Sequence, residues 1–223
     1  MKAFTKERGT LALLDWSDVN TDVIIPARYL KRIERTGYGP LLFADKRYVA
    51  GGAPPVDDPV KGGALDTAFP LNQPKYEKAS ILVVGKNFGC GSSREHAVWA
   101  VEQAGFRVMI APGKNEGFAD IFEGNALNNG LLVVELSDDD WSKVAQAARA
   151  DAPIEADVDL GTNVLKVFAA DGAFSVRFDL AEGPRQKLLK GLDAIGETLQ
   201  HAMAISRYEQ GAPPWAARPG VSV

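Results

Sequence analysis

The sequence lacks most of the features that mark specialised protein classes. Only one of its 223 residues is a cysteine, Cys90, so this chain alone can form neither an intrachain disulfide nor a cysteine-ligated metal cluster. No apolar run of about 18 residues occurs, which argues against a transmembrane helix. Residues 1–8 carry charges without an apolar core behind them, so no secretory signal is predicted. We therefore expect a cytoplasmic protein.

An excess of positive charge is also absent. The 25 lysines and arginines stand against 29 acidic residues, and the net charge of -4 argues against non-specific nucleic-acid binding. We expect neither nucleic acid nor a membrane as a partner. Hydrophobic residues make up 46% of the chain, as in ordinary globular proteins. No linker divides the chain, so a single domain over 1–223 is predicted, with residues 211–223 as a frayed tail that contains three prolines.

Strand and helix signals alternate through the middle of the chain. A continuous apolar run predicts a buried strand at 80–84, and further strands are predicted at 107–111 and 131–135. Because a helical pattern follows each strand, we predict an α/β fold with a parallel central sheet flanked by helices. The helices are expected at about 93–104, 118–127 and 138–150.

The outer segments give weaker signals. Ala170-Asp171-Gly172 predicts a hairpin with a type I′ turn between strands at 164–168 and 173–178. Gly191 and Asp193 are typical of a helix end and a helix start. The other elements expected are a strand at 9–14, a basic amphipathic stretch at 27–35, a helix at 41–49, a long loop at 50–74, and helices at 184–190 and 193–208.

Residues 85–96, which link the strand at 80–84 to the next helix, carry the most chemical information. Their glycines let backbone N–H groups approach a ligand, and the N-terminus of a helix attracts anions. Arg94 can pair bidentately with a carboxylate. The segment therefore predicts a carboxylate or phosphate site at the carboxyl end of a strand. A structural interpretation stays equally open, because Ser92 and Glu95 match a capping box.

A known family shares this segment. Residues 89–97, Gly-Cys-Gly-Ser-Ser-Arg-Glu-His-Ala, resemble the signature of the swivelling domain of the aconitase superfamily, and in particular the small subunits of isopropylmalate isomerases. The resemblance extends over residues 9–210 and implies a swivelling β/β/α domain with added β-hairpins. Further motifs in the same order lie at 20–26, 35–39, 118–122 and 191–199.

The resemblance implies a division of labour between two chains. A small subunit of this family binds no cofactor, and a separate large subunit holds a four-iron–four-sulfur cluster through three cysteines. The implied activity is that of a hydro-lyase that interconverts 2-isopropylmalate and 3-isopropylmalate, a small dicarboxylate, in leucine biosynthesis. We expect a heterodimer or heterotetramer, with this chain inactive alone. Cys90 fits this division as a buried thiol rather than a ligand.

The resemblance also implies roles for single residues. Ser92 would be the base that removes the carbon-bound proton, while Ser93 and Arg94 would hold a substrate carboxylate. A helix terminus lowers a pKa by only about one to two units, so Arg94 and the partner's iron must supply more of the stabilisation that a serine base needs. Supporting roles are expected for Thr21, Asp22, Glu95 and His96, with a purely structural His96 as the alternative.

The basic stretch at 28–35 matches the family's substrate-selecting lid. Leu30 and Ile33 would contact the isopropyl group, and Arg35 would neutralise the distal carboxylate. A solvated basic face is the alternative. Because the lid selects the substrate, a related hydro-lyase for citraconate, methylmalate-type or homoaconitate substrates stays open, and so does a non-catalytic RNA- or ligand-binding module.

One departure from the family pattern lies at residues 112–117, which look like a short insertion. Gly117 stands where the family commonly has a serine, so the next helix loses an expected cap. Asn115 is expected to replace that cap. The insertion bears on either substrate preference or docking of the partner.

Overall fold

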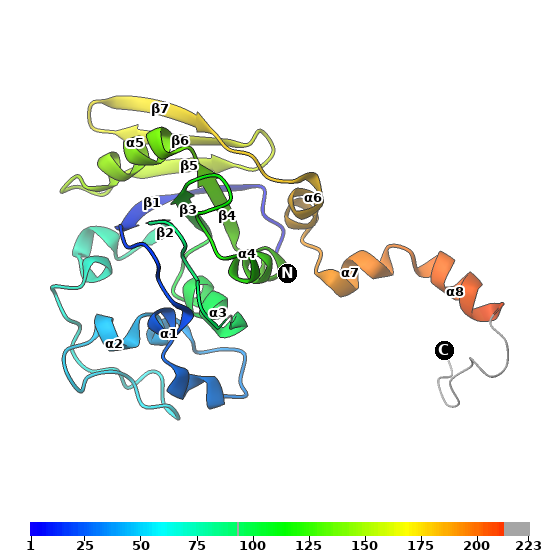
Figure 1. The fold of residues 1–223 in the computed structure, drawn as a ribbon, viewed down its shortest axis with the longest axis horizontal. Coiled ribbons are helices and arrows are strands. Elements are labelled where there is room, and N and C mark those ends of the chain that lie inside the picture. Colours follow the sequence, from blue (N-terminus) through cyan, green and yellow to red (C-terminus); the bar gives the residue numbers. More distant parts are fainter. Residues whose placement is uncertain (93, 212–223) are drawn as a thin grey trace.

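A seven-stranded mixed sheet forms the centre of the fold in a computed structural model, which describes residues 1–92 and 94–211 (Figure 1). The strand order is β4-β3-β2-β1-β5-β6-β7. Strands β1 to β4 run parallel, and β5 to β7 add an antiparallel half to the edge of β1. This confirms the predicted α/β class. The strands are β1 (Lys6–Leu14), β2 (Ala79–Val84), β3 (Val108–Pro112), β4 (Leu132–Leu136), β5 (Glu155–Asp159), β6 (Val164–Ala169) and β7 (Gly172–Arg177).

Helices cover both faces of the parallel half. Helices α3 and α4 pack against each other, and α5 lies on the opposite face across β1 to β4 (Figure 1). The predicted apolar runs form the core, since β2 and β3 are buried over almost their whole length. The α-helices are α1 (Thr21–Ile24), α2 (Ala44–Arg47), α3 (Glu95–Gln103), α4 (Asp120–Asn129), α5 (Asp138–Ala148), α6 (Glu182–Lys190), α7 (Ala194–Leu199) and α8 (Ala202–Gln210).

The C-terminal helices leave the body of the molecule, as Figure 1 shows for α7 and α8. Helix α6 ends at Gly191 with φ 68°, and the Asp193 side chain caps α7 by accepting a hydrogen bond from the N–H of Gly196 at 2.7 Å. Both predicted signals are therefore confirmed. The predicted single helix at 193–208 is wrong, because residues 200 and 201 separate α7 from α8. Except for Gly211, the predicted tail lies outside the described residues.

Two local predictions fail for backbone reasons. The helix expected at 41–49 is limited to α2, because Phe43 adopts a left-handed conformation (φ 53°) and Tyr48 is extended. The hairpin between β6 and β7 exists, but its two turn residues, Ala170 and Asp171, have no positive φ. The type I′ turn is therefore wrong.

Strand β5 was not predicted at all. Its sequence alternates acidic residues with Ala156 and Val158, and acidic residues have low strand propensity. Pairing with β1 on one side and β6 on the other forms the strand nevertheless. The predicted hairpin thus continues the central sheet through β5. No helix of the described residues is long and apolar enough to cross a membrane.

Candidate functional site

The turn after β2, residues 85–92, is held on one side by the segment that follows β1. Thr21 is fully buried there. Its N–H donates to the carbonyl of Cys90 at 3.0 Å, and its hydroxyl donates to the carbonyl of Ser92 at 2.8 Å. Thr21 therefore fixes the backbone from which the Ser92 side chain projects.

The other side of the turn pairs with the loop after β3. The N–H of Asn87 donates to Glu116 at 2.8 Å, and that of Phe88 donates to Gly117 at 2.9 Å. The carbonyl of Phe88 accepts from Ala119 at 3.0 Å. The turn thus lies between two neighbouring loops at the carboxyl ends of parallel strands, where open α/β sheets bind their ligands.

Glu135, on β4, anchors the loop that contains the predicted insertion. Its Oε1 accepts from the N–H groups of Gly117 at 2.9 Å and Phe118 at 3.2 Å, and its Oε2 accepts from Asn115 at 2.5 Å. The N-cap of α4 is Ala119, without a side-chain bond, so the expected cap by Asn115 is wrong. A carboxylate from a neighbouring strand satisfies the loop instead.

We expect Glu135→Gln to lower the free energy of unfolding by about 1–3 kcal/mol, because the amide nitrogen of Gln cannot accept the hydrogen bond from Asn115 and the remaining bonds lose their charge. Urea denaturation measures this loss, and amide hydrogen exchange localises it to residues 115–118. Glu209→Gln on α8, an exposed glutamate, is the matched control. Equal stabilities of the two variants would contradict the anchoring role.

Two glycines allow the turn to pass close to its neighbours. Gly89 and Gly91 have φ values of 82° and 86°, which L-residues with side chains rarely adopt. A Cβ at Gly89 would overlap the ring of Phe122, and one at Gly91 would overlap the amide of Asn20. Both positions therefore require glycine for conformation and for space.

Gly89→Ala is expected to destabilise the protein by about 2–4 kcal/mol, because left-handed strain and overpacking against Phe122 add. Gly51→Ala is the matched control, since Gly51 has φ 76° but no atom within 4 Å of the added Cβ. The control should lose only the strain, about 1–2 kcal/mol. Urea unfolding of both variants checks this, and equal losses would refute the close approach to Phe122.

Ser92 and Arg94 lie together at the end of the turn. Ser92 is exposed, and its Oγ accepts a hydrogen bond of 3.0 Å from Nη1 of Arg94. The Nε of Arg94 is buried and has no acceptor among the described residues. Such an orphaned donor costs about 1–3 kcal/mol, and an anion that accepted its hydrogen bond would remove the cost. Ser93 lies outside the described residues.

The capping-box interpretation is wrong. Helix α3 begins at Glu95, and its N-cap is Arg94 with no side-chain cap, so Ser92 lies outside the helix and keeps its hydroxyl for other partners. The carboxylate of Glu95 accepts from the amide of Asn129 at 3.0 Å and so joins α3 to α4. Glu95 therefore braces the helix that follows the turn.

His96 packs into an aromatic cluster on α3. Its ring lies 4.8 Å from that of Trp99 and 5.5 Å from that of Tyr38. Burial lowers the pKa of His96 below its ordinary value, and the nearby Arg94 adds to this, while Glu95 opposes it. The side chain is half-buried and its neutral form is favoured.

Comparison with known proteins identifies the family of the chain. The family described as "Aconitase C-terminal domain" matches residues 1–139, more than half of the chain. The chain belongs to the aconitase C-terminal domain family. The matched range contains both the turn after β2 and the basic stretch at 27–35.

Relatives within this family agree over almost the whole chain. The 3-isopropylmalate dehydratase small subunit of Desulforapulum autotrophicum is 43% identical over 221 residues, which cover 96% of this chain and 98% of that protein. The protein of the same name from Shewanella denitrificans is 45% identical and covers 97% and 100%. The crystal structure of 3-isopropylmalate dehydratase from Methanocaldococcus jannaschii superposes with a TM-score of 0.59 at 23% identity, covering 91% of this chain and 99% of that one, and this supports the fold.

Of the three residues expected to form a lid, Arg35 lies beside α3. The guanidinium of Arg35 lies 5.6 Å from the centre of the Trp99 ring, and Leu30 is half-buried against the core. Ile33 is 93% exposed. No hydrogen bond or ring contact joins any of these three residues to Ser92 among the described residues. The structure thus places Arg35 near the helix that follows the turn and leaves the apolar side chain of Ile33 exposed.

Asp22 and Cys90, near the same turn, differ in exposure. Asp22 is exposed, with its N–H bonded to the side chain of Asn20 at 2.8 Å, so Asn20 supports both Asp22 and the approach of Gly91. Cys90 is half-buried rather than buried, and its carbonyl, not its thiol, makes the contact with Thr21. Sequence reasoning missed Glu135. Its position at the end of a parallel strand is the signal that could have found it.

The donor set of this chain does not fit an iron–sulfur cluster. Such a cluster needs several cysteine thiolates, and Cys90 is the sole cysteine of the chain. In the part of the chain that the structure describes, no three His, Cys, Asp or Glu side chains converge as metal ligands would.

Proposed function

We propose that this chain is the small subunit of a 3-isopropylmalate dehydratase, a hydro-lyase of leucine biosynthesis that acts in a heteromeric complex. The observation that carries the proposal is the near-full-length identity of 43–46% to small subunits of that name. The exposed Ser92 and the half-buried Arg94 that bonds to it, at the carboxyl ends of the parallel strands, support it with a suitable site.

The residues of the turn would do the proton chemistry. Ser92, as its alkoxide, would take the proton from the carbon next to the hydroxyl-bearing carbon of 2-isopropylmalate, and the hydroxyl would leave as water after taking up a proton from an acid group of the partner. In the rehydration, water would add its oxygen to the other carbon and give one proton back to that acid, while Ser92 returns its proton to the carbon that lost the hydroxyl. Arg94, with Ser93, holds a carboxylate, and its guanidinium stabilises negative charge on the Ser92 oxygen 3.0 Å away.

The partner would complete the site. We place a four-iron–four-sulfur cluster in a large subunit, where it supplies a Lewis acid for the substrate hydroxyl. Exposure of Ser92 supports this, because a second polypeptide can reach it. A heterodimer or heterotetramer in the cytoplasm is the expected assembly.

Ile33 supplies a test of substrate selection. We expect Ile33→Ala to lower kcat/KM on 2-isopropylmalate by about 5- to 100-fold, because one apolar contact is worth about 1–3 kcal/mol, and to affect citraconate less. Leu30→Ala should show the same bias. Folding is not at risk in the first variant, since Ile33 is exposed. Val60→Ala, whose side chain is 84% exposed, is the matched control. Equal losses on both substrates would contradict the lid.

Reconstitution tests the function as a whole. The purified chain alone should be inactive, and it should isomerise 2-isopropylmalate once a cluster-bearing large subunit is added. Assays on 2-isopropylmalate and citraconate side by side decide between this function and a related hydro-lyase. Activity of the isolated chain without iron, or preference for citraconate, would overturn the proposal.

A further inference from the structure

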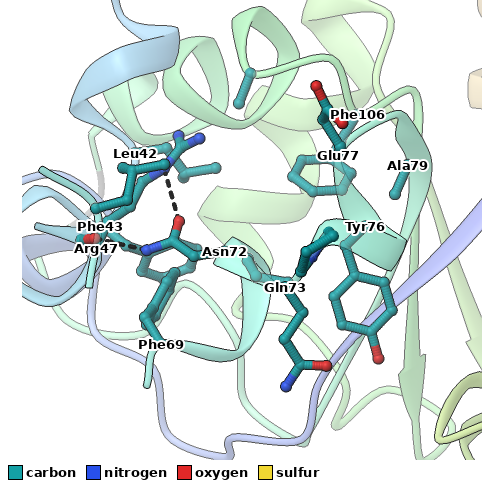
Figure 2. A pocket seen from close by; sticks show the side chains of 14 residues that line it. Leu42, Phe43, Arg47, Phe69, Asn72, Gln73, Tyr76, Glu77, Ala79 and Phe106 are labelled. Atoms are coloured by element: carbon teal, nitrogen blue, oxygen red, sulfur yellow. Dashed lines mark hydrogen bonds between the residues drawn. The ribbon is translucent and has the colours of Figure 1, made fainter. Parts of the chain in front are cut away.

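A recess at the opposite end of the parallel strands from the turn after β2 takes no part in the proposed reaction. It has a volume of about 350 Å³ and lies near the amino ends of β2 and β3, as its lining residues Ala79 and Phe106 show. Figure 2 shows Arg47 and Asn72 on one side and Phe106, Tyr76 and Glu77 on the other. The volume lies in the range of small-molecule sites.

The recess combines one cation with apolar walls. Nε of Arg47 donates to Oδ1 of Asn72 at 3.3 Å, and the amide of Asn72 donates to the carbonyl of Arg47 at 2.6 Å (Figure 2). Neither Nη of Arg47 has a hydrogen bond or ion pair within the described residues. The hydrogen bond at Nε thus orients the guanidinium of Arg47, while its two Nη groups stay available as donors. Glu77, the acidic residue of the lining, is exposed, where water screens its charge.

Backbone strain marks the same wall. Phe43, which lines the recess and precedes α2, has φ 53°, an unusual conformation for a bulky residue. Strain of this kind persists only where the surroundings impose it, and it is concentrated at ligand sites. The N–H of Phe43 donates to the carbonyl of Ile24 at 2.7 Å, which holds the conformation.

We propose that this recess binds a small carboxylate with an apolar tail. The two Nη groups of Arg47, which have no partner among the described residues, can donate to both oxygens of a carboxylate, because a guanidinium pairs with a carboxylate bidentately. The aromatic walls then cover the tail. Phosphate and other anions without an apolar part gain no binding free energy from contact with these walls. The site is separate from Ser92 and Arg94, and it does not depend on the proposed reaction.

The walls also connect the recess to the turn after β2. The ring of Phe43 lies 6.4 Å from those of both Trp16 and Phe88, and Phe69, another wall residue, lies 5.7 Å from Trp16. Phe88 belongs to the turn itself. The fluorescence of Trp16 should therefore report the binding of a ligand in the recess.

Titration with 4-methylpentanoate tests the proposal on the whole chain. Calorimetry should show saturable binding with a Kd of about 1 mM, typical of the few contacts of so small a ligand. Trp16 fluorescence should change in parallel, and Trp16→Phe should remove that change. The uncharged 4-methylpentanamide and inorganic phosphate should each bind about tenfold more weakly or not at all. Equal binding of acid and amide, or no saturable binding of the acid, overturns the proposal.

Variants locate the site. Arg47→Gln should weaken binding by about tenfold or more, and Arg47→Lys should weaken it less, because charge remains without the fork. Ala104 also lines the recess. Ala104→Leu should fill the recess and block binding while Arg47 stays, so it covers the case in which Arg47→Gln fails to fold. Arg177→Gln, at an exposed position of the edge strand β7, which three strands separate from β2 in the sheet order, is the matched control. Unchanged affinity in the Arg47 and Ala104 variants overturns the proposal.

Discussion

Replacing Ser92 by alanine is expected to lower kcat of the reconstituted enzyme by about 10²- to 10⁴-fold, the usual contribution of a general base. The KM for 2-isopropylmalate should change little, because Arg94 still holds the carboxylate. The variant should fold normally, since Arg94 is the one partner of the Ser92 hydroxyl among the described residues and it is the carbonyl that Thr21 holds. Steady-state kinetics with the large subunit present measures both constants.

Ser142→Ala, at an exposed position of α5, is the matched control and should leave both constants unchanged. A Ser92→Ala enzyme whose kcat stays within tenfold of the wild-type value would remove Ser92 from the role of base. Loss of complex formation with the large subunit would instead assign Ser92 to the interface, so the assembly is measured by size-exclusion chromatography in the same experiment.

Arg94→Lys is expected to lower kcat/KM by about 10²- to 10³-fold, because the ammonium group cannot hold a carboxylate bidentately while it bonds to Ser92. Both constants should change, since Arg94 serves binding and proton transfer. Arg94→Gln removes the charge altogether. Without that cation the pKa of the Ser92 hydroxyl rises, so the residual kcat of Arg94→Gln should keep increasing to higher pH than that of the wild type.

Arg149→Lys provides the control for Arg94→Lys, because Arg149 is a half-exposed arginine paired with Asp15 on another face. Its kinetics should match the wild type. If Arg94→Lys changed KM alone and left kcat and its pH profile intact, Arg94 would bind substrate without assisting Ser92.

The parallel half of the fold was predictable because its strands contain apolar runs. Residues 81–84 form most of β2, and burial on both faces explains why this run is apolar. The antiparallel half was harder, since β5 is acidic and becomes a strand only through partners far away in the chain. Lys6 pairs with Asp159, a contact that no local pattern reveals.

The sequence alone could suggest those candidate site residues that are close together in the chain. Ser92, Arg94 and His96 share one segment, so a motif exposes them together. Glu135 escaped because its function depends on which loop lies beside the end of β4. The cap expected at Asn115 failed for the same reason, since a carboxylate from another strand had already satisfied that backbone.

The position of β1 has a consequence for how the chain folds during synthesis. Its first half pairs with β5 and its second half with β2, as in Lys6 with Asp159 and Leu11 with Ile81. A ribosome-bound chain that ends before β5 therefore leaves the outer edge of β1 open. Strand pairings between residues so distant in the chain slow folding, because the entropy of closing the long loop is lost before the stabilising contacts form. Nascent chains of this protein should thus depend on chaperones until β5 has emerged.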